Sequence, residues 1–188
     1  MNFDDSDVKI FSDGNKKSDS FDEVSIIAEM TKQRSNGNVD RAKKLGQHLA
    51  NIFVDEPHLL HMLEGEVGKL EFDGDIMYQI KVLLVFTAEY CINHSLHALL
   101  ANTAVNSMYE TVSSKAFEFY DRLDDAAEYS FYYLAVRKGV DIPANIGISF
   151  AMLCGKEKDG YFSELGTKLF EVTKNEIENI IDLYEFIN

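Results

Sequence analysis

The stretch that decides the fold covers residues 76–110 and reads IMYQIKVLLVFTAEYCINHSLHALLANTAVNSMYE, with no glycine or proline in its 35 residues. From Ile76 onward its apolar residues recur mostly in alternating steps of four and three, which is the spacing of one face of an α-helix. One step breaks this spacing. The stretch is therefore either one long helix or two helices that meet near Asn93-His94-Ser95. Ala98, Ala101 and Ala104 are small enough to let another helix approach closely.

The flanking sequence carries further helix signals. Ser20-Phe21-Asp22-Glu23 has the form of a capping box. The chain's two prolines stand in Asp55-Glu56-Pro57 and Asp141-Ile142-Pro143, where each fits the first turn of a helix. A strong apolar pattern predicts one helix from Ser113 or Ser114 to Lys138. A last helical region is predicted over residues 161–187, as one helix or two.

These patterns predict an all-α protein, because no segment shows the alternating apolar and polar residues of a strand. We expect an irregular multi-helix bundle of six to eight helices, or helical hairpins stacked as in a solenoid. Residues 1–19 are rich in Asp, Ser, Asn and Lys and predict a mobile acidic tail. Residues 20–188 then form a single all-helical domain.

The net charge of the chain indicates which classes of partner are favoured. The formal charge is −14, from 32 acidic and 18 basic residues. Nucleic acid and anionic membranes both need clustered Lys and Arg, so neither is expected as a partner. A basic protein partner or a divalent cation fits the charge better, and a solvated surface that aids solubility is the simpler explanation. The absence of an apolar leader and the isolated Cys91 and Cys154 indicate a reducing cytoplasm of bacterial type.

Four of the five histidines form two pairs of one pattern, His58-Leu59-Leu60-His61 and His94-Ser95-Leu96-His97. Residues three apart lie on the same side of a helix, so each pair could present two imidazoles to one ligand. The apolar spacing places the first pair toward solvent and His94 on the apolar face. The four rings are therefore not expected to meet at one metal ion.

His94 needs a reason for its predicted place on an apolar face, because buried ring nitrogens require hydrogen-bond partners. The simplest reason is a packed histidine bonded to a carbonyl, a tyrosine or a serine. The alternatives are a ligand pocket between helices, lined by Tyr90, His94 and His97, or a metal site that adds a carboxylate from another helix. The identity of such a metal is left open, and no cofactor is predicted.

Aromatic residues are abundant in residues 117–133. Core packing explains most of them, but Tyr129, Tyr132 and Tyr133 lie off the main apolar stripe of the predicted helix. Tyrosine is common at protein interfaces, so these three are candidates for contact with a protein partner or a second copy of the chain.

Motifs of catalysis are missing. The chain has no phosphate loop, dinucleotide fingerprint or Glu-x-x-His pair, and Gly147-Ile148-Ser149-Phe150-Ala151 lacks the strand that a nucleophile elbow needs. The sequence therefore favours a non-catalytic interaction protein with a basic protein partner and leaves enzyme activity open. The alternative is a helical protein, an enzyme included, that binds a metal or small ligand around His94 and His97.

Overall fold

The computed structural model describes residues 19–70, 72–124 and 127–187, and all regular structure within them is helical. The predicted all-α class is confirmed, but the described residues form nine helices rather than six to eight. The helices are α1 (Asp19–Ser35), α2 (Asn38–Val54), α3 (Glu56–Val67), α4 (Gly74–Ser95), α5 (Ala98–Lys115), α6 (Phe117–Asp124), α7 (Glu128–Arg137), α8 (Ile142–Leu153) and α9 (Gly160–Leu183).

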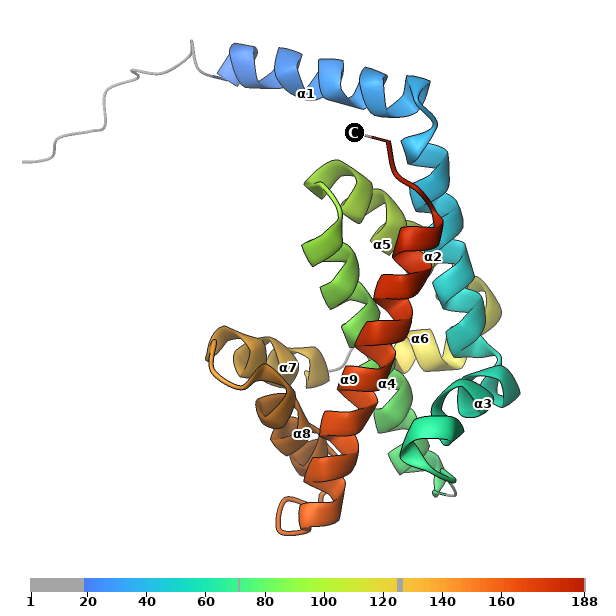
Figure 1. Cartoon of the computed structure of the whole chain (residues 1–188), viewed down its shortest axis with the longest axis vertical. Coiled ribbons are helices and arrows are strands. Elements are labelled where there is room, and N and C mark those ends of the chain that lie inside the picture. The colour runs from blue at the N-terminus through green and yellow to red at the C-terminus, as the bar shows by residue number, and fades with distance from the viewer. Residues whose placement is uncertain (1–18, 71, 125–126, 188) are drawn as a thin grey trace, which may run out of the picture. The chain divides into compact units, whose positions relative to one another are not determined.

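The chain divides into two units after Gly37. The first unit contains α1, where Ile26 and Ile27 are exposed and Lys32 and Arg34 lie in the last turn. The second unit contains α2 to α9 (Figure 1). The predicted mobile tail at residues 1–19 lies outside the described residues apart from Asp19, and the single domain over residues 20–188 stays a prediction.

Helix α4 is the centre of the second unit. Every residue from Val82 to Ala88 is buried, so this part of the helix is covered on all sides. Helices α5, α7, α8 and α9 all pack against it, while α2 packs mainly along α5 and α8 along α9 (Figure 1). The long apolar stretch of the sequence therefore supplies a fully covered helix, as expected for a helix that is apolar on most of its circumference.

The stretch over residues 76–110 forms two helices rather than one. Helix α4 ends at Ser95, Leu96 is extended, and His97 precedes the first residue of α5. The single helix predicted from Ser113 to Lys138 is wrong, because α5 ends at Lys115 and α6 and α7 follow as separate helices. Neither glycine nor proline stands at the end of α5. Ala116 leaves the helical conformation (φ −138°, ψ 57°), so tertiary packing overrides a favourable local pattern.

Two backbones approach closely where α2 crosses α5. A β-carbon at Gly46 would lie 2.1 Å from the Ala104 carbonyl oxygen, so only glycine fits. Ala101 and Ala104 are buried in agreement with the predicted close approach, whereas Ala98 is exposed.

Aspartates define the start of several helices. The side chains of Asp55, Asp73, Asp141 and Asp159 accept hydrogen bonds from backbone N–H groups in the first turns of α3, α4, α8 and α9. Both prolines stand in the first turn of a helix, as predicted. Among the described residues, no helix is both long and apolar enough to cross a membrane.

Candidate functional site

His94 is exposed, which corrects its predicted place on a buried face. Its Nδ1 lies 2.8 Å from the Tyr90 carbonyl oxygen and, because a carbonyl only accepts, donates the hydrogen bond. Its ring also packs on Tyr90, with 4.0 Å between the ring centroids. The prediction failed because it continued the apolar spacing to the end of α4, whereas the last buried residues of that helix are Cys91 and Ile92.

The other paired histidines are exposed as well. His97 caps the start of α5 without a side-chain hydrogen bond, and both His58 and His61 of α3 face solvent. The described residues contain no group of three or more His, Cys, Asp or Glu side chains arranged to hold a metal ion. Ligand binding by Tyr90, His94 and His97 stays a prediction.

The three candidate interface tyrosines have different surroundings. Tyr132 is 0% exposed and packs on Phe86, so its prediction as an interface residue is wrong: it faces the core side of α7. Tyr129 is half-buried, and Tyr133 is 49% exposed. Only Tyr133 of the three presents a large part of its side chain to a partner.

Tyr129 and Tyr133 belong to a hydrogen-bonded network around Glu89, which we call the tyrosine network and which also contains Tyr109. The hydroxyls of Tyr109 and Tyr133 donate to the two carboxylate oxygens of Glu89, at 2.6 and 2.5 Å. The hydroxyls of Tyr109 and Tyr129 lie 2.9 Å apart. Since Tyr109 gives its one proton to Glu89, Tyr129 must donate to Tyr109.

The electrostatics of the tyrosine network keep its hydroxyls protonated. Burial raises the pKa of Tyr109, Tyr129 and Tyr133, and the neighbouring Glu89 carboxylate raises the pKa of all three further. The network joins α4, α5 and α7. Its hydroxyls and carboxylate satisfy one another, which is the arrangement of a structural contact rather than an open site.

An open groove lies between α3, α4 and α6 and has a volume of about 480 Å³. We call it the α4–α6 groove. Its apolar lining consists of Phe72, Met77, Tyr78 and Phe119. The ring of Tyr78 meets Phe119 edge to face, with 5.7 Å between the centroids. The groove thus has an aromatic floor contributed by two helices.

Tyr78 is the least satisfied residue of the groove. Its side chain is 7% exposed, and its buried hydroxyl has no hydrogen-bond partner within the part of the chain that the structure describes. Burial raises the pKa of Tyr78, Glu128 raises it further, and Arg122 lowers it. A buried hydroxyl without a partner costs free energy.

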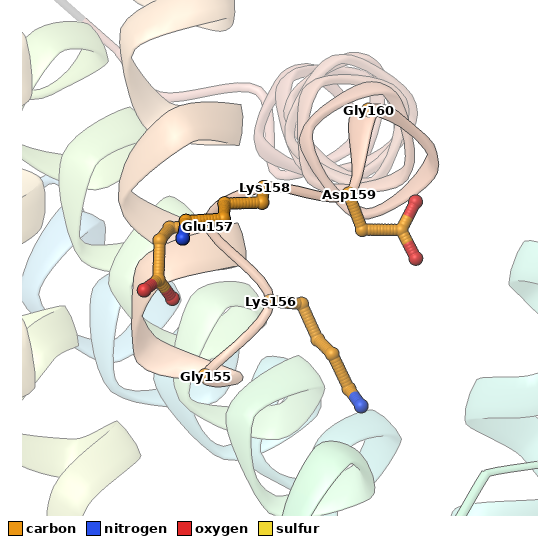
Figure 2. A pocket seen from close by; sticks show the side chains of 6 residues that line it. All are labelled: Gly155, Lys156, Glu157, Lys158, Asp159 and Gly160. Carbon is orange, nitrogen blue, oxygen red and sulfur yellow. The ribbon is translucent and has the colours of Figure 1, made fainter.

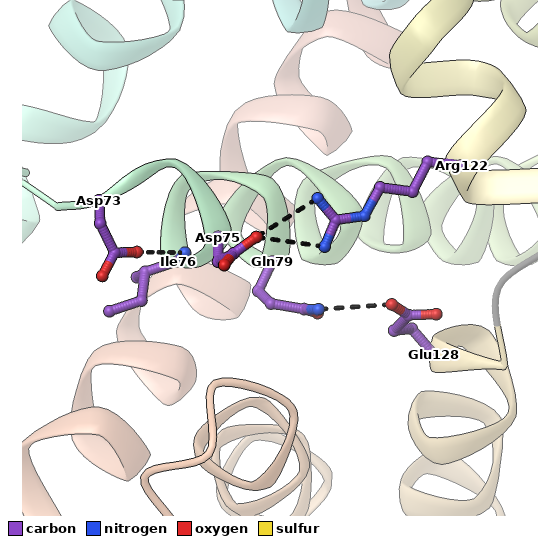
Figure 3. Close-up of polar contacts among 6 residues, drawn as sticks. All are labelled: Asp73, Asp75, Ile76, Gln79, Arg122 and Glu128. Carbon is purple, nitrogen blue, oxygen red and sulfur yellow. Dashed lines mark hydrogen bonds and ion pairs between the residues drawn. The ribbon is translucent and has the colours of Figure 1, made fainter.

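Charged side chains surround this floor. The Lys81 ammonium lies 2.6 Å from Glu56, and the Arg122 guanidinium carbon lies 3.6 Å from the centroid of the Tyr78 ring. Arg122 also reaches Asp75, with 3.4 Å between the closest nitrogen and oxygen (Figure 3). Glu118 completes the charged lining.

The start of α4 is fixed by neighbouring polar contacts. Figure 3 shows Asp73 accepting from the Ile76 N–H and Gln79 reaching across to Glu128 of α7. The amide nitrogen of Gln79 donates to Glu128 at 3.3 Å, while its buried carbonyl oxygen lacks a partner among the described residues. These contacts hold Tyr78 in position between a capped helix start and a cross-helix bond.

Sequence reasoning missed the groove. Tyr78, Lys81 and Arg122 carry no motif, and α3, α4 and α6 are separated in sequence, so only their packing brings them together. The sequence carries only a general signal, the net charge of −14, which a solvated surface explains equally well.

A second hollow is formed by the loop over residues 155–160 and has a volume of about 450 Å³ (Figure 2). All its lining residues are exposed and come from this one loop. In Figure 2 the side chains of Lys156, Glu157 and Asp159 point in different directions, so they offer no convergent set of polar groups to a ligand.

Comparison with protein-family models, curated proteins and solved structures gave no match.

Proposed function

We propose that this protein is a non-catalytic interaction protein that binds a basic segment of a partner protein in the α4–α6 groove. The observation that carries the proposal is an aromatic floor of Tyr78 and Phe119 on which the guanidinium of Arg122 already lies, with the carboxylates of Glu56, Asp75 and Glu118 around it. Pockets that combine apolar walls with a few polar groups are the usual form of a binding site.

Charge favours a basic ligand over an acidic one. The charged lining consists of Glu56 and Glu118 against Lys81 and Arg122, and Asp75, the ion partner of Arg122, adds a third carboxylate. Both cations are already paired with carboxylates. The net charge of −14 also attracts a basic partner and speeds its association.

The test is the affinity of the full chain for a fluorescent hexaarginine peptide, measured by anisotropy at several salt concentrations. We compare Glu118→Lys, in the groove, with Glu176→Lys, an exposed residue of α9. Both substitutions change the charge equally. We expect Glu118→Lys to weaken binding about tenfold, a contact worth ~1.4 kcal/mol, and Glu176→Lys to weaken it less than about threefold.

If both variants weaken hexaarginine binding equally, the peptide responds to the total charge alone. The groove is then not its binding site. Stronger binding of an anionic peptide such as hexaglutamate would show that Lys81 and Arg122 define the site instead.

A further inference from the structure

We infer that the α4–α6 groove selects arginine side chains and that Arg122 occupies the arginine position as an intramolecular competitor. The inference rests on the proposed function and adds the chemical class of the recognised side chain and a form of autoinhibition. It starts from the geometry of Arg122 over Tyr78.

Arg122 shows what the floor of the groove accepts. Its guanidinium carbon is 3.6 Å from the ring centroid of Tyr78, so a planar cation covers the aromatic face. Cations within about 6 Å of an aromatic centroid are attracted by the negative face of the ring. The floor is therefore a cation-binding surface that is already in use.

Arg122 is held weakly in this position. Its side chain is 53% exposed, and its partner Asp75 is 88% exposed. Ion pairs between exposed side chains contribute little, because water and salt screen them. An incoming cation can therefore displace Arg122 into solvent.

An arginine of the partner would gain more than Arg122 does. It would take the face of Tyr78 with both Asp75 and Glu118 nearby, and its five N–H donors can serve both carboxylates. A lysine offers no planar surface to stack and fewer directed donors. The groove therefore distinguishes arginine from lysine by stacking as well as by charge.

Competition by Arg122 lowers the affinity for the partner. A site that is open for only a fraction of the time binds more weakly by that fraction. Replacing Arg122 should therefore raise the affinity for an arginine peptide, which is the reverse of the usual effect of removing a binding-site side chain.

The experiment measures hexaarginine and hexalysine binding to the full chain with three substitutions, and helix content is checked by circular dichroism. Arg122→Lys keeps the charge and loses the planar group, Arg122→Ala loses both, and Arg137→Ala removes an equal charge from the exposed end of α7. We expect hexaarginine to bind the unsubstituted protein about fivefold more tightly than hexalysine. Its affinity should rise about threefold with Arg122→Lys and about tenfold with Arg122→Ala. Arg137→Ala should change it less than about twofold, because a distant surface charge is screened.

Two failures are distinguishable. If neither peptide binds more tightly to the unsubstituted protein than to Glu118→Lys, the proposed function itself is wrong. If hexaarginine binds through Glu118 but Arg122→Lys leaves its affinity unchanged, the function stands and the competitor role of Arg122 is wrong. Arg122→Lys decides the question even if Arg122→Ala loses helix content.

Discussion

The tyrosine network and the α4–α6 groove are built from the same chemical groups and differ in how those groups are paired. In the network, two tyrosine hydroxyls donate to Glu89 and a third donates to a tyrosine. In the groove, the Tyr78 hydroxyl has no partner among the described residues, and the charged side chains face solvent. Tyrosines and a carboxylate that satisfy one another hold helices together, whereas at the groove two carboxylates are paired with cations and the described residues leave the tyrosine hydroxyl unpaired. Four substitutions or conditions test this contrast.

The largest effect is expected at the aromatic centre beside the network. Phe86 is 1% exposed and contacts the rings of Tyr129, Tyr132 and Tyr133. Phe86→Ala should lower the free energy of unfolding by about 3–5 kcal/mol, because it leaves a cavity in a closed core. Phe119→Ala in the open groove should cost less than half as much. Urea denaturation measures both, and equal losses would remove the distinction between a closed and an open region.

Removing the acceptor of the network should have the next largest effect. Glu89→Ala leaves the hydroxyls of Tyr109 and Tyr133 without their acceptor. We expect a loss of about 1–3 kcal/mol in the free energy of unfolding, with Tyr109 the larger contributor because Tyr133 reaches water. Glu118→Ala in the groove should change stability by less than about 0.5 kcal/mol. A Glu89 variant as stable as the Glu118 variant would contradict a structural role for the network.

High pH should destabilise the protein through the tyrosine network. Tyr109 and Tyr129 have raised pKa values in the folded state, so folding favours their protonated forms. Their contribution is complete below about pH 10, the unfolded value for tyrosine, and is lost as pH rises above it. Each such tyrosine should steepen the loss by up to about 1.4 kcal/mol per pH unit. Thermal or urea unfolding between pH 8 and pH 11 should show a shallower loss for Tyr109→Phe, and identical slopes would count against the raised pKa.

The smallest effect is expected from Tyr78→Phe. Removing a buried hydroxyl without a partner should leave the free energy of unfolding within about 0.5 kcal/mol, or raise it. The same change at Tyr109 should destabilise the protein by about 1 kcal/mol, because that hydroxyl is bonded. A loss at Tyr78 as large as that at Tyr109 would mean that its hydroxyl is satisfied in solution.

The sequence predicted the fold class and several helix starts for identifiable reasons. Pro57 and Pro143 fix their own φ angles at values that suit the first turn of a helix, and the capping aspartates bond N–H groups within one turn. Both signals are therefore local. The helix predicted over residues 113–138 was wrong because Ala116 ends α5 through packing, without any breaking residue. His94 was misplaced for a related reason, since periodicity gives the direction of a side chain but not where the surrounding helices end.

The candidate site was less predictable than the fold. The apolar spacing that begins at Ile76 does not include Tyr78, and it does not indicate that Arg122 of α6 covers its ring. The tyrosine network shows the same limit, because its residues come from three helices. In both regions the contacts join residues that are distant in the sequence, so the sequence alone does not reveal them.

The glycine at the crossing of α2 and α5 has a consequence for the groove. With the backbone of α5 seated directly on Gly46, no side chain can adjust the distance between the two helices. Lys115 at the end of α5 also donates to Asn51 of α2, and Ala116 alone then connects α5 to α6. The position of Arg122 therefore depends, through α5 and Ala116, on the backbone contact at Gly46. If the groove binds the proposed arginine side chain, a mutation at Gly46 alters its selectivity while every residue of the groove stays the same, so a variant outside the groove has a binding phenotype.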